Sequence, residues 1–500
     1  MKLLGVDVGT GGSRALIMDE AGRMVAAATV EHLPFASPQT GWAEQDPRDW
    51  WRASAAAIVQ VLSESGIKAD DIKGVGLTGQ MHGAVLLDES GAVVRPALIW
   101  CDGRTAAQCQ ALTEKIGAER LLQLVLNPAL TGFTLPKLLW VREVEPENWA
   151  RAHSVLLPKD YVRFCLTGDR ATDVADASGM LLLDVGKRKW SAKMLQEAEI
   201  EARLLPQVFE STSITGVISA LGAAATGLRP GTPVVAGAGD QAAGAVGLGI
   251  VRPGAVSATI GTSGVVFAAT DKPAFDQHGR VHTFCHAIPN RWHVMGVTQA
   301  AGLSLRWFRD NFGAGDDDGR DPYERLSEEA ATAPAGADGV FWTPYLMGER
   351  APHLDPRARA TLTGLAANHT RSHIIRAILE GVAFSLRDTL AIFTEIGVPC
   401  EKIRLGGGGA RSKLWRQIQA DVYGQNVELA EVEEGAAYGA ALLAGVGINV
   451  WPTVEEACSA TVRVRETIEP NPATVALMNE QYQRFQQIYP ALRGLSQEHV

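Results

Sequence analysis

Short apolar runs separated by glycine-rich turns dominate the first thirty residues. Leu3–Val8 is largely apolar, whereas Ser13–Asp19 and Arg23–Val30 alternate between apolar and small or polar side chains. Alternation with a period of two is typical of a half-buried strand, and the glycines at Gly9–Gly12 and Gly22 mark turns. The chain is therefore expected to begin with antiparallel strands.

The pattern becomes helical over Pro47–Gly66, where apolar side chains recur every three to four residues. Asp46 followed by proline is a typical helix start. The residues expected to face the core from this helix are Trp51, Ala55, Ile58 and Leu62.

The same two periodicities predict the later elements. Helices are expected over Thr105–Val125, Lys137–Val144, Thr298–Phe312, Thr370–Ile396, Ala436–Gly445 and, near the end, Ala473–Gln487. Strands are expected over Ile72–Thr78, Val155–Leu157, Pro233–Ala236 and Ile403–Leu405. Gly313–Asp321 is expected to be an exposed acidic loop.

The second half of the chain repeats the beginning in weaker form. VDVGTGGSRALIM from Val6 and ATIGTSGVVFAAT from Ala258 both read as a strand, a Gly-Thr turn and a strand. A turn at Val251–Gly254 lies between them and is the expected domain boundary. The sequence predicts an N-terminal domain over 1–250, a C-terminal domain over 251–450 and a helical tail over 451–500.

This duplication resembles, at the level of the fold, the actin, sugar-kinase and heat-shock-chaperone superfamily. The expected fold class is α/β, with two duplicated ribonuclease-H-like domains facing each other across an ATP cleft. A chain of 500 residues fits two large domains, because single cores rarely grow beyond about 250–300 residues. Fold alone does not decide function, so the motifs must do so.

Charge and cysteine content exclude several classes of protein. The net charge of −10 argues against binding to nucleic acid or a membrane surface, which needs a basic face. The 6 cysteines form no CxxC pair, which indicates free thiols and a cytoplasmic protein. No apolar run approaches the length of about 20 residues that a membrane span requires.

Two glycine turns have the composition of phosphate-binding turns. In Asp7–Gly12 the glycines allow backbone N–H groups to approach anionic oxygens, and Thr10 adds a hydroxyl. Asp7 at the end of the strand is a candidate for holding Mg²⁺ through water. One such turn is more often an ordinary hairpin. The second turn at Gly261–Gly264 and a later glycine run make nucleotide binding the better interpretation.

The later glycine run is Gly406–Gly409, which follows an expected strand and precedes a helix that starts near Trp415. Four consecutive glycines allow close packing against a flat adenine ring. The alternative is a Rossmann dinucleotide site. That site needs GxGxxG at the start of a βαβ unit and an acid about 20 residues later, and the spacing fits poorly.

Asp240 is the candidate catalytic base. It follows a short apolar strand and begins a helix of small residues, QAAGAVG. The dipole at the helix N-terminus favours the ionised carboxylate. The simpler interpretation is a helix N-cap, which is compatible with the catalytic role.

A second group of candidates lies after the strand at Ile72–Thr78. Gln80, Met81 and His82 are expected to line a polyol pocket, although a buried histidine is often a hydrogen-bonded core residue. Trp100 is a candidate for stacking on a sugar face, although a tryptophan at a strand end is more often core. A zinc site formed by His282, Cys285, His286 and His293 is rejected, because their spacing matches no closed set of four ligands.

Several long motifs resemble the FGGY carbohydrate kinases, from Leu3 to about Gly447. They are DVGTGGSR at the start, GFTLPKLLW, GDQAAGAVG, IGTSG, YLMGERAP, GLAANHTRSHIIRAILEGVAFSLRD and GGGGARSKLWRQIQAD. The resemblance implies ATP and Mg²⁺ as cofactors, Asp240 as proton acceptor and Asp7 beside magnesium. It implies sugar contacts at Met81 and His82, and it places Gln241 near the sugar. Nucleotide contacts are expected from Thr10, Gly11, Arg14, Gly261, Thr262, Gly302, Gly408, Gly409 and Ala410.

Within that family, GQMHGAVLLD, LIWCDGR, LLPKDYVRFCLTG and TFCHAIP are similar to the xylulokinase branch. The implied reaction is phosphorylation of D-xylulose at O5, by a protein that forms a homodimer. Gln241 and Cys101 depart from that branch, where asparagine is usual at both positions. The alternatives are an FGGY kinase for another ketose, a polyol or a sugar acid, and a non-enzymatic ATPase module.

Overall fold

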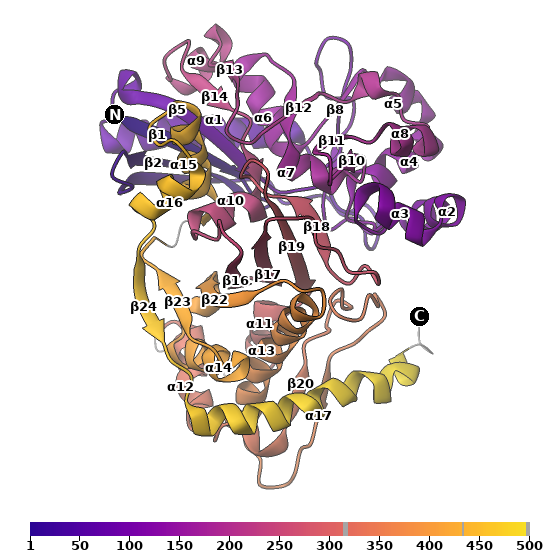
Figure 1. Cartoon of the computed structure of the whole chain (residues 1–500), viewed down its shortest axis with the longest axis vertical. Helices are drawn as coiled ribbons and strands as arrows, with labels where there is room; N and C mark the ends of the chain where they lie inside the picture. The colour runs from indigo at the N-terminus through magenta and orange to yellow at the C-terminus, as the bar shows by residue number, and fades with distance from the viewer. Residues whose placement is uncertain (314–318, 433–434, 497–500) are drawn as a thin grey trace.

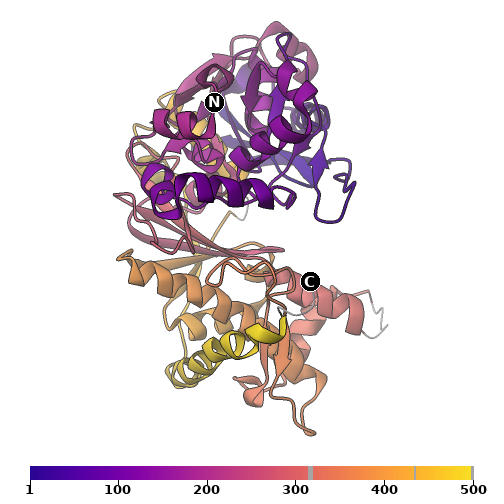
Figure 2. The ribbon, with the colours of Figure 1, turned by 90° about the vertical axis from the view of Figure 1, so that its right-hand side faces the viewer.

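The computed structural model describes residues 1–313, 319–432 and 435–496. These residues form two lobes, each built on a 7-stranded mixed sheet with helices on its faces (Figures 1 and 2). The predicted acidic loop falls largely on residues 314–318, which lie outside the described residues. None of the helices in the described ranges is both long and apolar enough to cross a bilayer.

The N-terminal sheet has the strand order β13-β14-β5-β1-β2-β3, with β15 pairing on β5. The predicted antiparallel start is confirmed: β1, β2 and β3 form a meander, and β5 and β14 then run parallel to β1. The strands are β1 (Lys2–Val8), β2 (Gly12–Asp19), β3 (Met24–Glu31), β5 (Ile72–Gly79), β13 (Ile214–Val217), β14 (Pro233–Val235) and β15 (Ala238–Gly239).

The C-terminal sheet repeats this arrangement in the order β18-β19-β17-β16-β22-β23-β24. A meander of β16, β17 and β19 is followed by β22 and β23, which run parallel to β16, and by an antiparallel β24. The strands are β16 (Gly254–Ile260), β17 (Gly264–Thr270), β18 (His282–Cys285), β19 (Trp292–Thr298), β22 (Cys400–Gly406), β23 (Val427–Ala430) and β24 (Val464–Ile468). The duplication predicted from two short segments therefore extends over the whole framework.

Helix α1 (Pro47–Ser65) packs on the N-terminal meander and starts as predicted, with the Asp46 carboxylate accepting from the backbone N–H of Arg48. Its buried face includes Trp50, Ala53, Ala57 and Val61. Of the four residues predicted to face the core, Ala55 and Ile58 are buried, and Trp51 and Leu62 are partly buried against the same core. Because Trp50 and Trp51 are adjacent, either of them could start the apolar face of the helix. In the structure Trp50 is buried, and its Nε1 donates to Gln45 Oε1 at 3.1 Å.

Helix α10 (Asp240–Gly247) packs against helix α15 (Gly435–Gly447), which covers a face of the N-terminal sheet (Figure 1). Helix α15 lies close to both α10 and β1 because one residue at each contact is a glycine. A Cβ on Gly5 would lie 1.9 Å from the carbonyl oxygen of Ala437, and one on Gly439 would lie 1.8 Å from that of Ala243. Although α15 falls within the range 251–450, it lies in the N-terminal lobe.

The segment after Trp451 is part of both lobes. Helix α16 (Val454–Thr461) packs on α10 and α15, whereas β24 is the last strand of the C-terminal sheet. Helix α17 (Pro472–Ser496) contains the predicted helix and extends it. Its buried Met478, Tyr482 and Phe485 belong to the core of the C-terminal lobe. The described part of the predicted tail, residues 451–496, thus completes the fold.

The remaining elements form smaller layers around the two sheets. The predicted helix over Thr105–Val125 is two helices, α2 and α3, because Gly117 between them has φ = 91°. The other elements of the N-terminal half are β4 (Glu44–Gln45), β6 (Val85–Leu87), β7 (Ala97–Leu98), α2 (Ala106–Ile116), α3 (Ala118–Val125), α4 (Thr134–Val144), α5 (Pro146–Arg151), β8 (Ser154–Leu156), α6 (Pro158–Thr167), β9 (Ala171–Asp173), α7 (Val174–Ala177), β10 (Leu183–Asp184), β11 (Lys189–Trp190), α8 (Ala192–Ala198), β12 (Gln207–Phe209) and α9 (Ala220–Thr226). Those of the C-terminal half are α11 (Ala301–Phe312), α12 (Pro322–Ala330), β20 (Phe341–Thr343), β21 (Thr361–Thr363), α13 (Arg371–Glu395) and α14 (Lys413–Tyr423).

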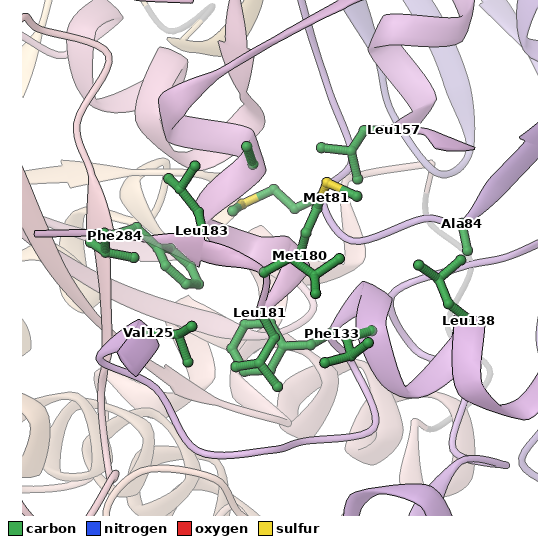
Figure 3. Close-up of a cluster of buried hydrophobic side chains, with 14 of the residues drawn as sticks. Met81, Ala84, Val125, Phe133, Leu138, Leu157, Met180, Leu181, Leu183 and Phe284 are labelled. Carbon is green, nitrogen blue, oxygen red and sulfur yellow. The ribbon is translucent and has the colours of Figure 1, made fainter. Parts of the chain in front are cut away.

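One hydrophobic core is shared by the two halves of the chain (Figure 3). Met81, Phe133 and Met180 from the N-terminal half pack around Phe284, which lies on β18 of the C-terminal sheet. These side chains are at most 5% exposed. The junction between the lobes is therefore a packed interface on this side.

Candidate active site

Parallel strand register brings three predicted segments to one edge of the N-terminal sheet. Val8 at the end of β1 is aligned with Gly79 of β5, and Gly79 is aligned with Gly239 of β15. The chain leaves these three strands at the Gly9–Gly12 turn, at Gln80 and at Asp240. Ligands of open α/β sheets bind at the carboxyl ends of parallel strands, so this edge is the candidate active site.

The Gly9–Gly12 turn is held from behind by Gln80. The Gln80 amide nitrogen donates to Gly9 O at 3.3 Å, and its amide oxygen accepts from Thr10 Oγ1 at 3.3 Å. Gln80 is 2% exposed and supports this turn, and its expected place in a polyol pocket stays a prediction. Trp100 remains exposed at the same edge, where its Nε1 donates to Thr10 Oγ1 at 2.9 Å.

Asp240 is the first residue of α10, and Gly239 occupies the N-cap position, so the alternative of a simple cap does not hold. Burial raises the pKa of Asp240 to about 6, against hydrogen bonds from the backbone and side chain of Gln241 that favour the ionised form. A carboxylate with this pKa is ionised at neutral pH and still basic enough to accept a proton from a hydroxyl.

Met81 packs next to the start of α10, and His82 follows it in the chain. Met81 packs on Gly239, where a Cβ would lie 2.8 Å from Met81 Cγ. His82 Nδ1 faces the carbonyl oxygen of Gly179 at 2.8 Å, so in the neutral ring Nδ1 carries the proton and Nε2 is an acceptor. Burial, with the charge of Lys137, lowers the pKa of His82 to about 3. A neutral His82 can accept a hydrogen bond from a sugar hydroxyl.

The C-terminal sheet brings its own turns together in the same way. Thr259 of β16 is aligned with Gly406 of β22, so the turns that follow these strands emerge side by side. The backbone N–H of Gly302 donates to Gly261 O at 2.9 Å, and that of Leu303 donates to Thr262 O at 3.1 Å. The start of α11 is thereby joined to the Gly261–Gly264 turn.

The glycines at these turns fall into two groups. Gly302, Gly407 and Gly409 are required by packing, because a Cβ would lie 2.4, 2.5 and 2.6 Å from Gly261 O, Ile260 O and Ile260 Cβ. The second group leaves the backbone accessible, with nothing in the described residues closer than 3.7 Å to an added Cβ, and consists of Gly11, Gly261 and Gly408. This is the arrangement that a phosphate or a flat ring needs in order to reach the main chain.

Asp7 and Arg14 face each other in register on β1 and β2. Arg14 Nη1 also donates to Thr29 Oγ1 at 2.6 Å. The described residues contain no group of three or more His, Cys, Asp or Glu that could hold a metal. Magnesium bound to phosphates needs only one or two protein carboxylates and keeps several waters, so Asp7 fits that role.

Two family models match most of the chain. The N-terminal domain of the FGGY family of carbohydrate kinases matches residues 2–247, and its C-terminal domain matches residues 256–448. The chain belongs to the FGGY family of carbohydrate kinases. The family resemblance noted from the sequence motifs is confirmed, and so is the two-domain α/β fold.

Curated relatives of this FGGY kinase match it over nearly its full length. The xylulose kinase of Bacillus subtilis (strain 168) is 38% identical over 494 residues, which are 99% of this chain and 98% of the relative. That of Escherichia coli (strain K12) is 40% identical over 447 residues, with 89% and 90% covered. The solved xylulose kinase from Rhodospirillum rubrum is 31% identical and superimposes with a TM-score of 0.91, covering 99% and 100%.

A buried cluster of charges next to the Asp240 site of this FGGY kinase was not anticipated. Lys159 Nζ lies 2.5 Å from Asp160 Oδ1, 2.7 Å from Asp173 Oδ2 and 3.8 Å from Asp176 Oδ2, and none of these side chains is exposed. Burial raises the pKa of Asp176 well above its ordinary value, and the charge of Asp240 acts in the same direction. The charged residues of this cluster lie in two short segments, PKD (Pro158–Asp160) and TDVAD (Thr172–Asp176). The sequence does not show that these two segments are in contact.

The signature GFTLPK supports His82. Lys137 Nζ donates to His82 O at 3.1 Å and to Gly132 O at 2.6 Å, and Thr134 Oγ1 donates to His82 O at 3.1 Å. His82 has φ = 71°, a conformation that a residue with a Cβ rarely adopts. These donors fix that conformation, so the motif positions a candidate sugar contact.

Proposed function

We propose that this FGGY kinase transfers the γ-phosphoryl group of ATP to O5 of D-xylulose and forms D-xylulose 5-phosphate. The observation that carries the proposal is the full-length similarity to xylulose kinases, at 38% identity over 99% of the chain for the Bacillus subtilis relative. The contact of Met81 with Gly239, the residue before Asp240, also supports it.

In this mechanism Asp240 accepts the proton of the 5-hydroxyl. The sugar oxygen O5 forms a bond to the γ-phosphorus of ATP, and the bond between that phosphorus and the leaving oxygen of ADP breaks. Positioning by a protein can supply about 7–11 kcal/mol, whereas a general base gives about 10²–10⁴-fold. Asp240 therefore orients the hydroxyl as much as it deprotonates it. His82, Met81, Trp100 and Gln241 hold the sugar, and Gln241 also hydrogen-bonds Asp240.

The nucleotide contacts are proposed at the glycine turns of both lobes. The open backbone at Gly11, Gly261 and Gly408 supports this assignment. Magnesium beside Asp7 would neutralise charge on the transferred phosphoryl group. The full set of proposed nucleotide contacts is Thr10, Gly11, Arg14, Gly261, Thr262, Gly302, Gly408, Gly409 and Ala410.

The lobes take different roles in this proposal. The N-terminal lobe binds the sugar and the C-terminal lobe binds most of the nucleotide, with the change from one to the other at Val251–Gly254. Closure would exclude water from the γ-phosphate. The homodimer and the cytoplasmic location stay predictions from the family resemblance, and light scattering tests the first.

A coupled ADP-release assay over a panel of ketoses, pentitols and aldonic acids tests the proposed function. The expected result is the highest kcat/KM with D-xylulose, together with a product whose phosphate is on O5. Activity with several sugars but none with D-xylulose would leave a kinase with another substrate. ADP release that no sugar changes would indicate an ATPase module.

A sugar-acid kinase is the second candidate. It is favoured by one observation: Lys137 and Arg350 both lower the pKa of His82 by their charge, after the larger effect of burial. Cations beside the sugar contacts would suit a carboxylate. The aldonic acids in the panel distinguish this candidate from a ketose kinase.

A further inference from the structure

Arg350 belongs to the C-terminal half of the chain but reaches the sugar side. Its Nη1 lies 3.4 Å from His282 Nε2 on β18. A Cβ added to Gly132 would lie 3.5 Å from Arg350 Nη2 and 3.3 Å from Trp100 O. Gly132 is the residue whose carbonyl holds Lys137, so the guanidinium is adjacent to the groups that support His82.

The loop that carries Arg350 is fixed on both sides of that residue. Glu349 and Asp355 exchange two backbone hydrogen bonds at 2.9 and 2.8 Å, and the N–H of Ala351 donates to Val297 O at the end of β19 at 3.1 Å. The Glu349 carboxyl accepts from Thr298 Oγ1 at 2.5 Å. Arg350 therefore projects from a backbone that is already ordered.

The C-terminal helix braces the same loop. Tyr489 Oη on α17 donates to Asp355 Oδ2 at 2.6 Å, and its ring stacks on His353 with centroids 3.8 Å apart. His353 Nε2 in turn contacts Tyr345 Oη at 3.1 Å. The last helix of the chain thus supports a loop that lies against the substrate side of the other lobe.

Within the described ranges, the guanidinium of Arg350 forms no ion pair, although the charge of the adjacent Glu349 favours its protonated form. Its contact at His282 is with a ring whose pKa burial keeps well below the ordinary value. A guanidinium carries five N–H donors in a planar fork. Donors held in this way are suited to oxygen acceptors on a ligand.

We propose that Arg350 hydrogen-bonds the oxygens at C1 and C2 of the ketose, so that the C-terminal lobe supplies part of the sugar site and favours a ketose over its polyol. This inference rests on the proposed function. Arg350 is then a specificity-determining residue. It lies in the YLMGERAP motif but is not among the sugar contacts that the family motifs lead us to expect.

The order of the contacts gives the orientation. Met81 touches Gly239, the residue before Asp240, where the 5-hydroxyl is activated. His82 follows Met81 and packs its ring on Phe133 with centroids 5.1 Å apart, and Phe133 in turn packs on His282 at 5.4 Å. Arg350 contacts His282, at the far end of this series. A substrate with O5 at Asp240 therefore has its carbonyl end toward Arg350.

The test compares Arg350→Met and Arg350→Lys with the unchanged enzyme on D-xylulose and on its two reduction products, xylitol and D-arabitol. For Arg350→Met we expect kcat/KM with D-xylulose to fall about 100-fold, because a hydrogen bond to a charged group is lost. The two pentitols keep acceptor hydroxyls at C1 and C2 but lack the carbonyl, so they should lose clearly less than D-xylulose, and KM for ATP should stay within twofold. Arg350→Lys should recover part of the ketose preference.

Arg357→Met is the matched control, since Arg357 lies in the same loop, is exposed and has its Nε 3.9 Å from Asp355 Oδ1. It should leave the ketose preference unchanged. Equal losses on ketose and pentitols for Arg350→Met, or no loss on D-xylulose, would overturn the proposal. If thermal unfolding shows that Arg350→Met is unstable, the test uses Arg350→Lys instead. A ketose preference in Arg350→Lys that equals that of the unchanged enzyme would also overturn the proposal. The proposed function itself depends only on D-xylulose turnover by the unchanged enzyme, so the two failures are distinguishable.

Discussion

The two lobes share one strand order but present different chemistry at the carboxyl ends of their parallel strands. In the N-terminal lobe these ends lead to Asp240, His82 and a buried cluster around Lys159. In the C-terminal lobe they lead to the glycines at Gly261 and Gly408. In the proposed mechanism the N-terminal lobe acts through side chains and the C-terminal lobe through accessible main chain.

This difference explains why the lobes are sensitive to different changes. Side-chain chemistry depends on charge and pKa, which burial sets: the pKa of Asp240 rises to about 6 because it is buried. Main-chain chemistry depends on the absence of a Cβ, as at Gly302. Each prediction below alters one lobe and leaves the other as an internal reference.

The largest expected effect is that of Asp240→Asn. Loss of the general base should lower kcat by about 10²–10⁴-fold, whereas binding of a non-hydrolysable ATP analogue, measured by calorimetry, should change less than threefold. Asp184→Asn, in a hairpin of the same half, is the control. Near-normal turnover by Asp240→Asn would show that another group accepts the proton.

Lys159→Met should cause the largest loss of stability. Removing the cation leaves Asp160 and Asp173 buried without compensation, which costs about 3–5 kcal/mol in the free energy of unfolding. Urea unfolding measures it. Lys187→Met is the control, because that ion pair with Asp184 has a lysine side chain that is 68% exposed and should contribute less than about 1 kcal/mol. Equal effects of the two substitutions would contradict a special role for the buried cluster.

Gly302→Ala tests the C-terminal lobe. The added Cβ would lie 2.4 Å from the backbone oxygen of Gly261, so the turn must shift. KM for ATP should rise about tenfold, and KM for the sugar should change less than twofold. Gly494→Ala, with open space around it on α17, should leave both unchanged. A rise in the sugar KM alone would contradict the division of roles between the lobes.

The smallest expected effect is a pH dependence that belongs to the N-terminal lobe. Because Asp240 must be ionised to accept a proton and its pKa is about 6, kcat/KM should fall by about half between pH 7.5 and pH 6. It should then fall about five- to sixfold from pH 6 to pH 5 and close to tenfold per pH unit below that. His82, with a pKa of about 3, cannot cause a loss of activity in this pH range. The Gly302→Ala variant should lose activity at the same pH as the unchanged enzyme. If kcat/KM began to fall only below pH 4.5, the assignment of Asp240 would be contradicted.

The sequence predicts the C-terminal site better than the N-terminal one. Glycine runs are contiguous, and their role follows from the missing Cβ, so Gly261–Gly264 and Gly406–Gly409 could be located directly. The positions of Asp240 and His82 also follow from strand ends. Lys159 with Asp176, and Arg350 with Gly132, are contacts between distant segments, which periodicity cannot detect.

Two further features of the structure have no sequence signal, for equally physical reasons. Gln80 is expected at the sugar because it precedes Met81 and His82, and in the structure its amide hydrogen-bonds Gly9 and Thr10 from behind. Helix α15 lies within residues 256–448, which the C-terminal family model matches. Its backbone contacts with Gly5 and Gly76 place it in the N-terminal lobe, and glycine pairing between distant segments leaves no sequence signal.

The position of α15 has a consequence for synthesis on the ribosome. The chain passes from the N-terminal lobe to the C-terminal lobe after α10, returns for α15 and α16, and passes back again for β24. Domains generally fold as units while the chain emerges, but here one face of the first sheet stays uncovered until Gly447 has been translated. A nascent chain paused before α15 would expose that apolar face, so the first half depends on the second for its own completion during translation.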